Sequence, residues 1–488
     1  MPYDLRSALE RLKTVPGQLA HLDSPVDSDA EITGLYRHIG AGGTVMRPTK
    51  RGPALLCSNI IGFPGSSVLI GLLASRERVG YLLECPPERL AFKLNEALEH
   101  PIQPIHRDVM ENAPCQEIVR LAADEDFDIR NILPAPRNTE EDAGPYITMG
   151  LCYATDPETG EKDITIHRLC LQSKDEMTMS FAPGRHLGVY RDKAEQMGKN
   201  LPISISIGVD PAIAIASCFE PPTTPLGYNE LGVVGGLRGE AVELVKCKTI
   251  EEYAIANAEF VVEGELVAGQ RMDEDINTGT GKAMPEFPGY TGVASKAIPV
   301  VKIKAVTYRR NPIIQTCIGS SEEHVNMAGL PTEASIMAMT ERALPGVVRN
   351  VYAHPAGGGK YMAIMQFRKS TINDEGRQRQ AALAAMTAFI ELKHVILVDE
   401  DVDIFDSDDV LWALNTRYQG DIDTIAIPGV RFHPLDPTAC PEYNQSLMTK
   451  GLSCKTIFDC TVPFDQKSRF IRSRFKEVDV SKYDIIPY

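Results

Sequence analysis

The stretch DITIHRLCLQ (163–172) is the first of four segments that decide the fold class of this chain. It is rich in β-branched and other apolar residues, and turn-forming residues flank it. Three later segments share this character, namely ISISIGV (203–209), AEFVVEGELV (258–267) and IPVVKIKAVTYRR (298–310). Several such strands separated by long loops predict a sheet that closes into a barrel.

The segments on either side of this strand-rich region predict mixed helix and strand. Upstream, ALLCSNIIGF (54–63) has the composition of a buried strand. Downstream, RQRQAALAAMTAFIEL (377–392) is a strong helix, followed by the strand HVILV (394–398) and the helix DDVLWALNTR (408–417). We therefore predict an α+β chain of three parts, which are an N-terminal α/β region, a central barrel and a C-terminal α/β domain, over residues 1–125, 126–320 and 321–488.

The composition is that of a globular protein and argues against several partners. The chain has 488 residues, of which 43% are hydrophobic and 24% charged, and its formal net charge is −16. An acidic chain without a basic tract is expected to bind neither nucleic acid nor an anionic membrane. The 11 cysteines form no CxxC pair, and neither a signal peptide nor a transmembrane stretch is visible, so we expect reduced thiols and a cytoplasmic location.

Two segments that suggest other chemistry match their patterns poorly. GGGK (357–360) lacks the glycine that a phosphate loop has six residues before its lysine, and the Ser or Thr after it, because His354 and Tyr361 stand there. The acidic run DEDVDIFD (399–406) could hold a divalent cation, but we favour a loop whose aspartates cap the next helix. The sequence has no nicotinamide, serine-hydrolase or zinc-protease signature.

Arg168 lies among apolar side chains in the first strand. The two-residue period puts it on one face with Ile164, Ile166 and Cys170. An arginine on the inner face of a barrel is costly unless it meets an anion. A buried structural ion pair and a bidentate clamp for a carboxylate or phosphate both meet this requirement, and the pattern leaves both open.

Four acidic or imidazole side chains are candidates for a metal site and for proton transfer. Asp163 opens the first strand, His186 follows in GRHLG and Glu230 lies in GYNELG, a set that could hold a divalent cation beside a phosphate. Each of the three, taken alone, is more often a turn or helix-capping residue than a metal ligand. Glu286 in AMPEFPGY lies between two prolines and an aromatic residue, where partial desolvation would suit its carboxyl to proton transfer, unless it is an ordinary loop glutamate.

In the order and spacing of these residues the chain resembles the UbiD-type reversible decarboxylases, which use prenylated FMN. The resemblance covers nearly the whole chain and rests on Ile166 with Arg168, His186, GYNELGVVGGLRGEAVELVKC (227–247) and AEFVVEGEL (258–266). The branch of gallate and protocatechuate decarboxylases is the most similar. The segments that resemble this branch are YRHIGAGGTVMRP (36–48), NTEEDAGPYITMG (138–150), FEPPTTPLGYNELG (219–232), GKAMPEFPGY (281–290), EEHVNMAGLPTEAS (322–335) and VDEDVDIFDSDDVLWA (398–413).

The resemblance implies a split β-barrel that binds prenylated FMN, with Mn²⁺ and K⁺ linking the cofactor phosphate to the protein, and a C-terminal domain that mediates oligomerisation. The family's metal ligands fall on Asp163, His186 and Glu230, its cofactor contacts on these three and on Thr165, Ile166, Arg168 and Arg185, and two of its three catalytic residues on Arg168 and Glu286. Two positions depart from the family. Asp163 replaces the usual Asn, and Thr291 stands where the third catalytic residue, an acid, is expected.

The implied reaction is the reversible, non-oxidative decarboxylation of an aromatic acid such as protocatechuate or gallate, through a covalent adduct with the cofactor. Arg168 would orient the substrate carboxylate, and Glu286 would deliver a proton to the ring carbon after CO₂ leaves. His324, Lys360 and His433 lie in segments that resemble the hydroxybenzoate branch, and their side chains can bond to or deprotonate a phenol. Contact with ring hydroxyls is one interpretation; the alternatives are solvated or capping histidines, and a Lys360 that contacts phosphate or solvent.

Two other functions stay open on the sequence alone. The same cofactor chemistry could act on a pyrrole-, indole- or furan-carboxylate, because the motifs specify the cofactor better than the substrate. A non-catalytic flavin-binding protein is the second alternative, although the presence of both Arg168 and Glu286 argues against it. The resemblance further implies a flavin prenyltransferase that supplies the cofactor, and a homodimer or higher homo-oligomer.

Overall fold

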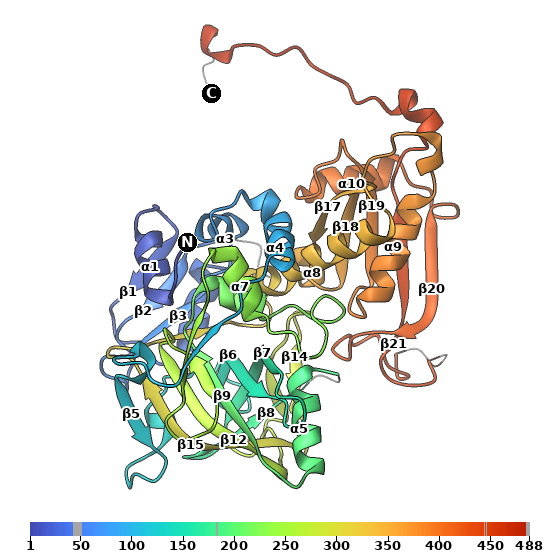
Figure 1. Ribbon diagram of the computed structural model, residues 1–488. Helices are drawn as coiled ribbons and strands as arrows, with labels where there is room; N and C mark the ends of the chain where they lie inside the picture. Colours follow the sequence, from blue (N-terminus) through green and yellow to red (C-terminus); the bar gives the residue numbers. More distant parts are fainter. Residues whose placement is uncertain (42–50, 182–183, 444, 446, 485–488) are drawn as a thin grey trace.

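The strand-rich middle of the chain forms the predicted barrel (Figure 1). In the computed structural model, which describes residues 1–41, 51–181, 184–443, 445 and 447–484, six strands close in the order β12-β9-β6-β7-β8-β15, and β15 pairs back onto β12. The strands of this sheet are β5 (Ile118–Leu121), β6 (Tyr146–Thr155), β7 (Lys162–Leu171), β8 (Glu176–Met179), β9 (Leu201–Ile207), β12 (Phe260–Met272) and β15 (Ile298–Tyr308), of which β5 extends the sheet beyond β15.

Strand β9 shows how the barrel is covered on its outside. Its isoleucines are fully buried, as their alternation with serine predicts. Its serines are buried too, because Ser204 Oγ donates to the Tyr253 carbonyl at 2.6 Å and Ser206 Oγ accepts from the Ile255 amide at 3.2 Å. These partners belong to a small outer sheet, formed by β4 (Ile105–Arg107), β10 (Glu243–Lys246) and β11 (Tyr253–Ile255).

The N-terminal region forms its own sheet and exchanges strands with the barrel. Its sheet has the order β1-β2-β3-β16, whose last strand comes from beyond the barrel in sequence, whereas β5 from the N-terminal third joins the barrel. Strand β2 is shorter than the predicted 54–63, because the chain turns after Cys57 toward Gly62, whose φ of 85° favours glycine. The elements are β1 (Leu19–Leu22), β2 (Ala54–Cys57), β3 (Ser67–Ile70), β16 (Ile313–Thr316), α1 (Leu5–Lys13), α2 (Glu31–Ile39), α3 (Arg76–Leu82) and α4 (Leu90–Glu99).

The C-terminal domain is an α/β unit, as predicted, and α8 leads into it from the barrel (Figure 1). Its sheet has the order β17-β18-β19-β21-β20, with parallel pairing of β18, β19 and β21. Its elements are α8 (Glu322–Ala343), β17 (Val348–Ala353), β18 (Met362–Phe367), α9 (Arg377–Ala388), β19 (His394–Asp399), α10 (Ser407–Thr416), β20 (Thr424–Arg431) and β21 (Leu452–Asp459).

Hydrogen bonds show that one sequence prediction for this domain is wrong and another is right. Helix α9 ends at Ala388, four residues before the predicted end at 392, because Phe389 is extended and the Lys455 ammonium caps the last turn by donating to the Met386 and Phe389 carbonyls, at 2.9 Å each. The capping interpretation of the acidic run 399–406 is confirmed, since the side chain of Asp406 accepts from the Asp408 amide at the start of α10.

The three parts share one core. A continuous cluster of buried apolar side chains joins the N-terminal helices to the C-terminal sheet through α4, α7 (Leu231–Arg238) and α8, as in Leu94, Val234, Leu330 and Val395. The C-terminal domain therefore packs directly against the rest of the molecule through buried apolar side chains.

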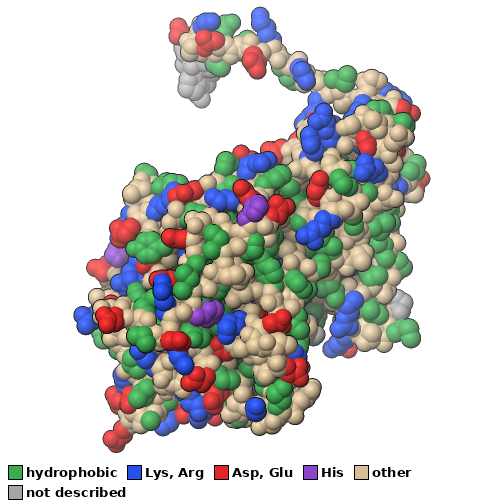
Figure 2. All heavy atoms as spheres, in the orientation of Figure 1, with side chains coloured by type: hydrophobic (Ala, Val, Ile, Leu, Met, Phe, Trp, Pro, Cys, Tyr) green, Lys and Arg blue, Asp and Glu red, His purple; other side chains and the backbone are tan. Residues whose placement is uncertain are grey.

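The outer surface is mixed in charge. Acidic and basic side chains are interspersed over the face shown in Figure 2, and residues 471–484 are all exposed and run away from the body (Figure 1). Among the described residues, no helix combines the length and apolar character that crossing a membrane requires. All 11 cysteines, each of them described, are free thiols. Residues 42–48 of the segment 36–48, which carried part of the resemblance, lie outside the described ranges.

Candidate active site

A cavity of about 460 Å³ lies between the barrel and the C-terminal domain. This volume is in the range of small-molecule and cofactor sites. Eight of the residues singled out in the sequence line it, namely Thr165, Ile166, Arg168, Arg185, Glu286, His324, Lys360 and His433. The structure therefore brings the predicted cofactor, catalytic and substrate residues to one space, although they are spread over almost 270 positions of the chain.

The three predicted metal ligands form a buried cluster next to this cavity. Asp163 lies in β7, two residues before Thr165, while His186 begins α5 (His186–Gln196) and Glu230 is the N-cap of α7. One ligand atom of each lies within 4.8 Å of those of the other two, and His186 Nδ1 is 3.0 Å from Asp163 Oδ1. Within the described residues, no second group of this kind was found.

This cluster fits a divalent cation. Asp163 Oδ2, His186 Nε2 and Glu230 Oε2 are buried and have no hydrogen-bond partner in the described part of the chain. Burial raises the pKa of Asp163, and burial followed by the charge of Asp163 raises the pKa of Glu230 well above its usual value. A bound cation would supply the missing partners and favour the charged form of both carboxylates.

Arg168 and Glu286, the predicted catalytic pair, are in direct contact. Arg168 projects from β7, and Glu286 lies in the turn between β13 (Lys282–Pro285) and β14 (Thr291–Val293), where its Oε1 accepts from Arg168 Nη1. This turn packs against Gly319, at which a Cβ would lie 2.3 Å from the Pro285 carbonyl oxygen, so only glycine permits the approach. The side chains of Arg168 and Glu286 are 19% and 14% exposed, and both line the cavity.

Sequence reasoning missed a second carboxylate on Arg168, that of Glu274. Glu274 Oε1 lies 3.2 Å from Arg168 Nε, and its Oε2 accepts from Arg168 Nη2 at 3.3 Å. Glu274 is 1% exposed and also accepts from the Tyr146 hydroxyl and the Ser295 amide. Arg168 does form ion pairs, as one interpretation of the sequence predicted. It also lines the cavity with Glu286, so the guanidinium is not enclosed in the core.

Thr291 does not take part in this arrangement. It is exposed on β14 and is absent from the residues that line the cavity. Glu274 thus supplies an acid to Arg168 from a different place in the sequence, 12 residues before Glu286 instead of five after it. The only signal that could have indicated it is the acidic run 273–275 directly after β12.

The C-terminal wall of the cavity is built around the ring of Phe287. His324 stacks on this ring with a centroid distance of 5.2 Å and an interplanar angle of 3°, and His433 meets it edge-on at 5.2 Å. The glycines before Lys360 form a tight turn, because a Cβ at Gly358, whose φ is 66°, would lie 2.6 Å from the Phe287 ring. The segment GGGK is thus a packed turn that delivers Lys360 to the cavity.

The electrostatics of the cavity suit an anionic ligand. Arg168, Arg185 and Lys360 line it, and Arg185 Nη2 donates to Glu220 Oε1 at 2.5 Å. Burial lowers the pKa of His324 to about 3 and also lowers that of His433, so both imidazoles are neutral near pH 7. These three cations share the space with the carboxylates of Glu220 and Glu286 and outnumber them, which suits a phosphate or carboxylate ligand.

His167 is a second residue that sequence reasoning missed. It lines the cavity although the strand period placed it on the face opposite Arg168. Its Nδ1 is 3.1 Å from the Ser180 carbonyl, and burial lowers its pKa to about 3, which leaves Nε2 as an acceptor without a partner among the described residues. No sequence pattern distinguishes this histidine.

Three family models match the chain and together span most of it. They are described as the 3-octaprenyl-4-hydroxybenzoate carboxy-lyase N-terminal domain, which matches residues 10–98, the Rift-related domain, which matches 107–322, and the C-terminal domain, which matches 325–460.

Relatives and solved structures match over nearly the full length. Gallate decarboxylase of Lactiplantibacillus plantarum is 52% identical over 99% of both chains. The apo structure of a 3,4-dihydroxybenzoic acid decarboxylase from Enterobacter cloacae is 54% identical, with a TM-score of 0.93 over 99% of this chain and 98% of that one. The UbiD-class enzyme HmfF from Pelotomaculum thermopropionicum, solved in complex with FMN, is 32% identical, with a TM-score of 0.85 over 99% and 100%.

Proposed function

The chain belongs to the UbiD family, and from that premise we propose that it is a decarboxylase of dihydroxy- or trihydroxybenzoates that uses prenylated FMN. Relatives that are 52% and 54% identical to this chain carry the names of a gallate decarboxylase and a 3,4-dihydroxybenzoic acid decarboxylase. Within the family, an evolved dimeric form of HmfF has been solved with prFMN, which supports both this cofactor and a homo-oligomeric state.

One observation carries the proposal. A single cavity brings the Arg168–Glu286 pair from the barrel to face His324, Lys360 and His433 from the C-terminal domain. The proposed reaction needs both groups of residues. The Arg168–Glu286 pair can hold a carboxylate and move a proton, and the C-terminal residues offer polar atoms to ring substituents.

The residues present fit the cofactor as well. Thr165, Ile166 and Arg185 would contact it, and Asp163, His186 and Glu230 would hold Mn²⁺ beside its phosphate. Loss of CO₂ from an aromatic ring leaves an electron pair on the ring carbon, and the bound prenylated flavin supplies the sink for it. The K⁺ ion and the prenyltransferase that supplies the cofactor stay predictions from the resemblance.

The chain's own residues bind the substrate and move the proton. Arg168 orients the substrate carboxylate through its planar guanidinium, and Glu274 and Glu286 keep that guanidinium in place. After CO₂ leaves, Glu286 takes up one proton from solvent and delivers it to the ring carbon that bore the carboxylate, which returns its own carboxylate to the charged form. In the reverse direction the same carboxylate removes this proton, so one residue serves both directions.

The experiment is co-expression with a flavin prenyltransferase, followed by the absorption spectrum and intact mass of the bound cofactor. We expect prenylated FMN, together with release of CO₂ and catechol or pyrogallol from 3,4-dihydroxybenzoate or gallate. Turnover of pyrrole-, indole- or furan-carboxylates in place of hydroxybenzoates would overturn the substrate class, and a bound flavin without turnover of any acid would favour a flavin-binding protein.

A further inference from the structure

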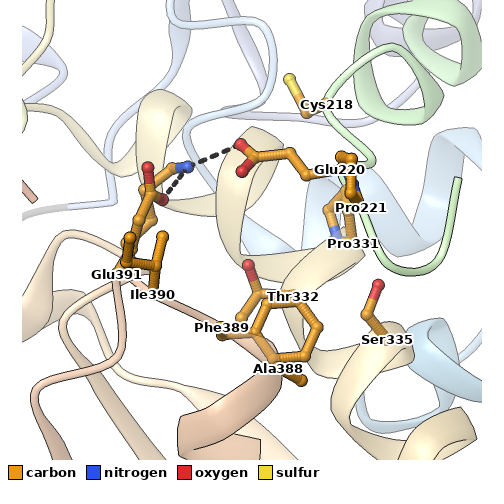
Figure 3. A pocket seen from close by; sticks show the side chains of 11 residues that line it. Cys218, Glu220, Pro221, Pro331, Thr332, Ser335, Ala388, Phe389, Ile390 and Glu391 are labelled. Carbon is orange, nitrogen blue, oxygen red and sulfur yellow. Dashed lines mark hydrogen bonds and ion pairs between the residues drawn. The ribbon is translucent and has the colours of Figure 1, made fainter. Parts of the chain in front are cut away.

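Lys360 separates the active-site cavity from a second, smaller chamber. This chamber, of about 40 Å³, is shown in Figure 3 and is lined by side chains of α8, of the loop around Pro221 and of the segment 388–391. Lys360, Cys218 and Glu220 line both spaces, whereas Glu391 lines only the chamber. Glu391 therefore approaches Lys360 from the side away from the substrate cavity.

The Lys360 ammonium makes two bonds to carboxylates, both drawn as dashed lines in Figure 3. It donates to Glu220 Oε1 at 2.9 Å and to Glu391 Oε2. An ammonium has three N–H donors. One donor is left, and because Lys360 lines the active-site cavity, that donor is available to a ligand there.

Glu391 also lies next to His433 and bears on the hydrogen bonds that its two ring nitrogens can make. His433 Nε2 lies 3.3 Å from Glu391 Oε1, and His433 Nδ1 accepts from the Leu435 amide at 3.1 Å. A neutral imidazole has one donor and one acceptor, so acceptance at Nδ1 assigns the proton to Nε2, which faces Glu391 Oε1. His324 differs, because its Nδ1 is buried and has no hydrogen-bond partner among the described residues.

The charges around Lys360 keep it protonated. Burial lowers the pKa of Lys360, but the carboxylates of Glu220 and Glu391 outweigh this effect and raise it above its usual value, against the opposing charge of Arg185. The other titratable groups that face it, namely Cys218, His324 and His433, are neutral near pH 7, since burial raises the pKa of the thiol and lowers that of both imidazoles. Lys360 can thus donate to a ring oxygen but cannot remove its proton.

We propose that Glu391 is a positioning residue for substrate recognition, which holds Lys360 as a charged donor toward one ring oxygen and ties back His433. His324 lines the same cavity, so the wall offers a charged donor and a neutral imidazole to an aromatic acid that carries two ring oxygens. This inference rests on the proposed function and assigns separate roles to side chains that the sequence presented as equivalent.

The test compares Glu391→Gln with Glu375→Gln in holoenzyme. Glu375 is the matched control, because its carboxylate accepts from Lys369 Nζ at 2.7 Å in the same domain but lines neither space. For E391Q we expect KM for 3,4-dihydroxybenzoate to rise about tenfold, with kcat changed much less and flavin and metal content unchanged. The basic limb of the pH profile of kcat/KM should move to lower pH, because Lys360 loses one neighbouring charge.

A conservative variant keeps the test decisive if E391Q is poorly folded. Glu391→Asp retains the negative charge beside Lys360. The basic limb of its pH profile of kcat/KM should therefore lie where it does in the wild type, even though the shorter side chain weakens the hydrogen bond to Lys360. An E391Q enzyme that matches E375Q in KM and in pH profile would overturn the inference while leaving the proposed function intact. A wild type that turns over no hydroxybenzoate would overturn the proposed function, and the inference with it.

Discussion

The two walls of the active-site cavity are built on opposite principles. Behind the barrel wall, the cluster of Asp163, His186 and Glu230, which does not line the cavity itself, leaves buried polar atoms without partners among the described residues. On the C-terminal side, Lys360 Nζ donates to two carboxylates, and His433 accepts at Nδ1 and faces Glu391 with Nε2. The barrel wall is incomplete without a ligand, whereas the C-terminal wall is largely arranged in advance.

This difference suggests that the barrel side serves the reaction itself, whereas the C-terminal wall serves the choice of substrate. An unpartnered buried polar atom costs about 1–3 kcal/mol, so a cluster of them is tolerated where a bound group completes it. A network that is already satisfied can instead present one donor or acceptor at a fixed place. We therefore expect changes in the barrel wall to affect every substrate, and changes in the C-terminal wall to depend on the substituents of the ring.

The largest effect is expected for Glu286→Gln. Glutamine keeps the shape and can still accept from Arg168, but it cannot deliver a proton, and loss of a general acid typically costs ~10²–10⁴-fold in rate. Steady-state decarboxylation and flavin content measure the two consequences, and flavin content should be unchanged. Activity within a few-fold of wild type would remove Glu286 from the reaction.

Arg168→Lys should be nearly as damaging. A point ammonium cannot bridge Glu274, Glu286 and a substrate carboxylate as the planar guanidinium does, and we expect a loss of roughly 10²–10³-fold in kcat/KM on all substrates. The measurement is kcat/KM on a dihydroxybenzoate and on a heteroaromatic acid. Full activity would reduce Arg168 to a structural ion pair.

Glu230→Ala tests whether the barrel wall is completed by a metal. We expect Mn²⁺ and flavin content to fall together, by at least about tenfold, because the ion would bridge the carboxylate and the cofactor phosphate. Elemental analysis and flavin absorbance report the two contents. Asp163→Asn serves as the control and should be tolerated, since Asn keeps an oxygen ligand and is usual in the family. A Glu230→Ala protein that loses the metal but keeps its full flavin content would contradict the proposal that the ion links Glu230 to the cofactor phosphate.

The smallest and most selective effects are expected on the C-terminal wall. His324→Leu should lower kcat/KM on a dihydroxybenzoate by roughly fivefold to tenfold, because an imidazole that lines this wall is lost, and should affect an acid without hydroxyls less. His433→Leu should impair the same substrates through the loss of the imidazole that faces Glu391. Equal losses on both substrate types, or none on either, would reject recognition of the hydroxyls by this wall.

The strand period and local motifs correctly predicted those structural elements that depend on residues close together in the sequence. The barrel strands, the α/β nature of the C-terminal domain and the helix cap at Asp406 follow from alternation, composition and capping chemistry. Helix α9 ran past its real end in the prediction because its cap, Lys455, comes from a strand 67 residues after Ala388. Such a contact has no local signal.

The sequence by itself determined which residues we propose for the chemistry, since the family pattern places Asp163, His186, Glu230, Arg168 and Glu286 in a recognisable order. Only the tertiary structure decided how they are partnered. The acid on Arg168 is Glu274 and not the residue at 291, and the chamber side of Lys360 belongs to Glu391. Hydrogen bonds and charges act through space over a few ångströms, so partners that are distant along the chain become visible only when the fold brings them together.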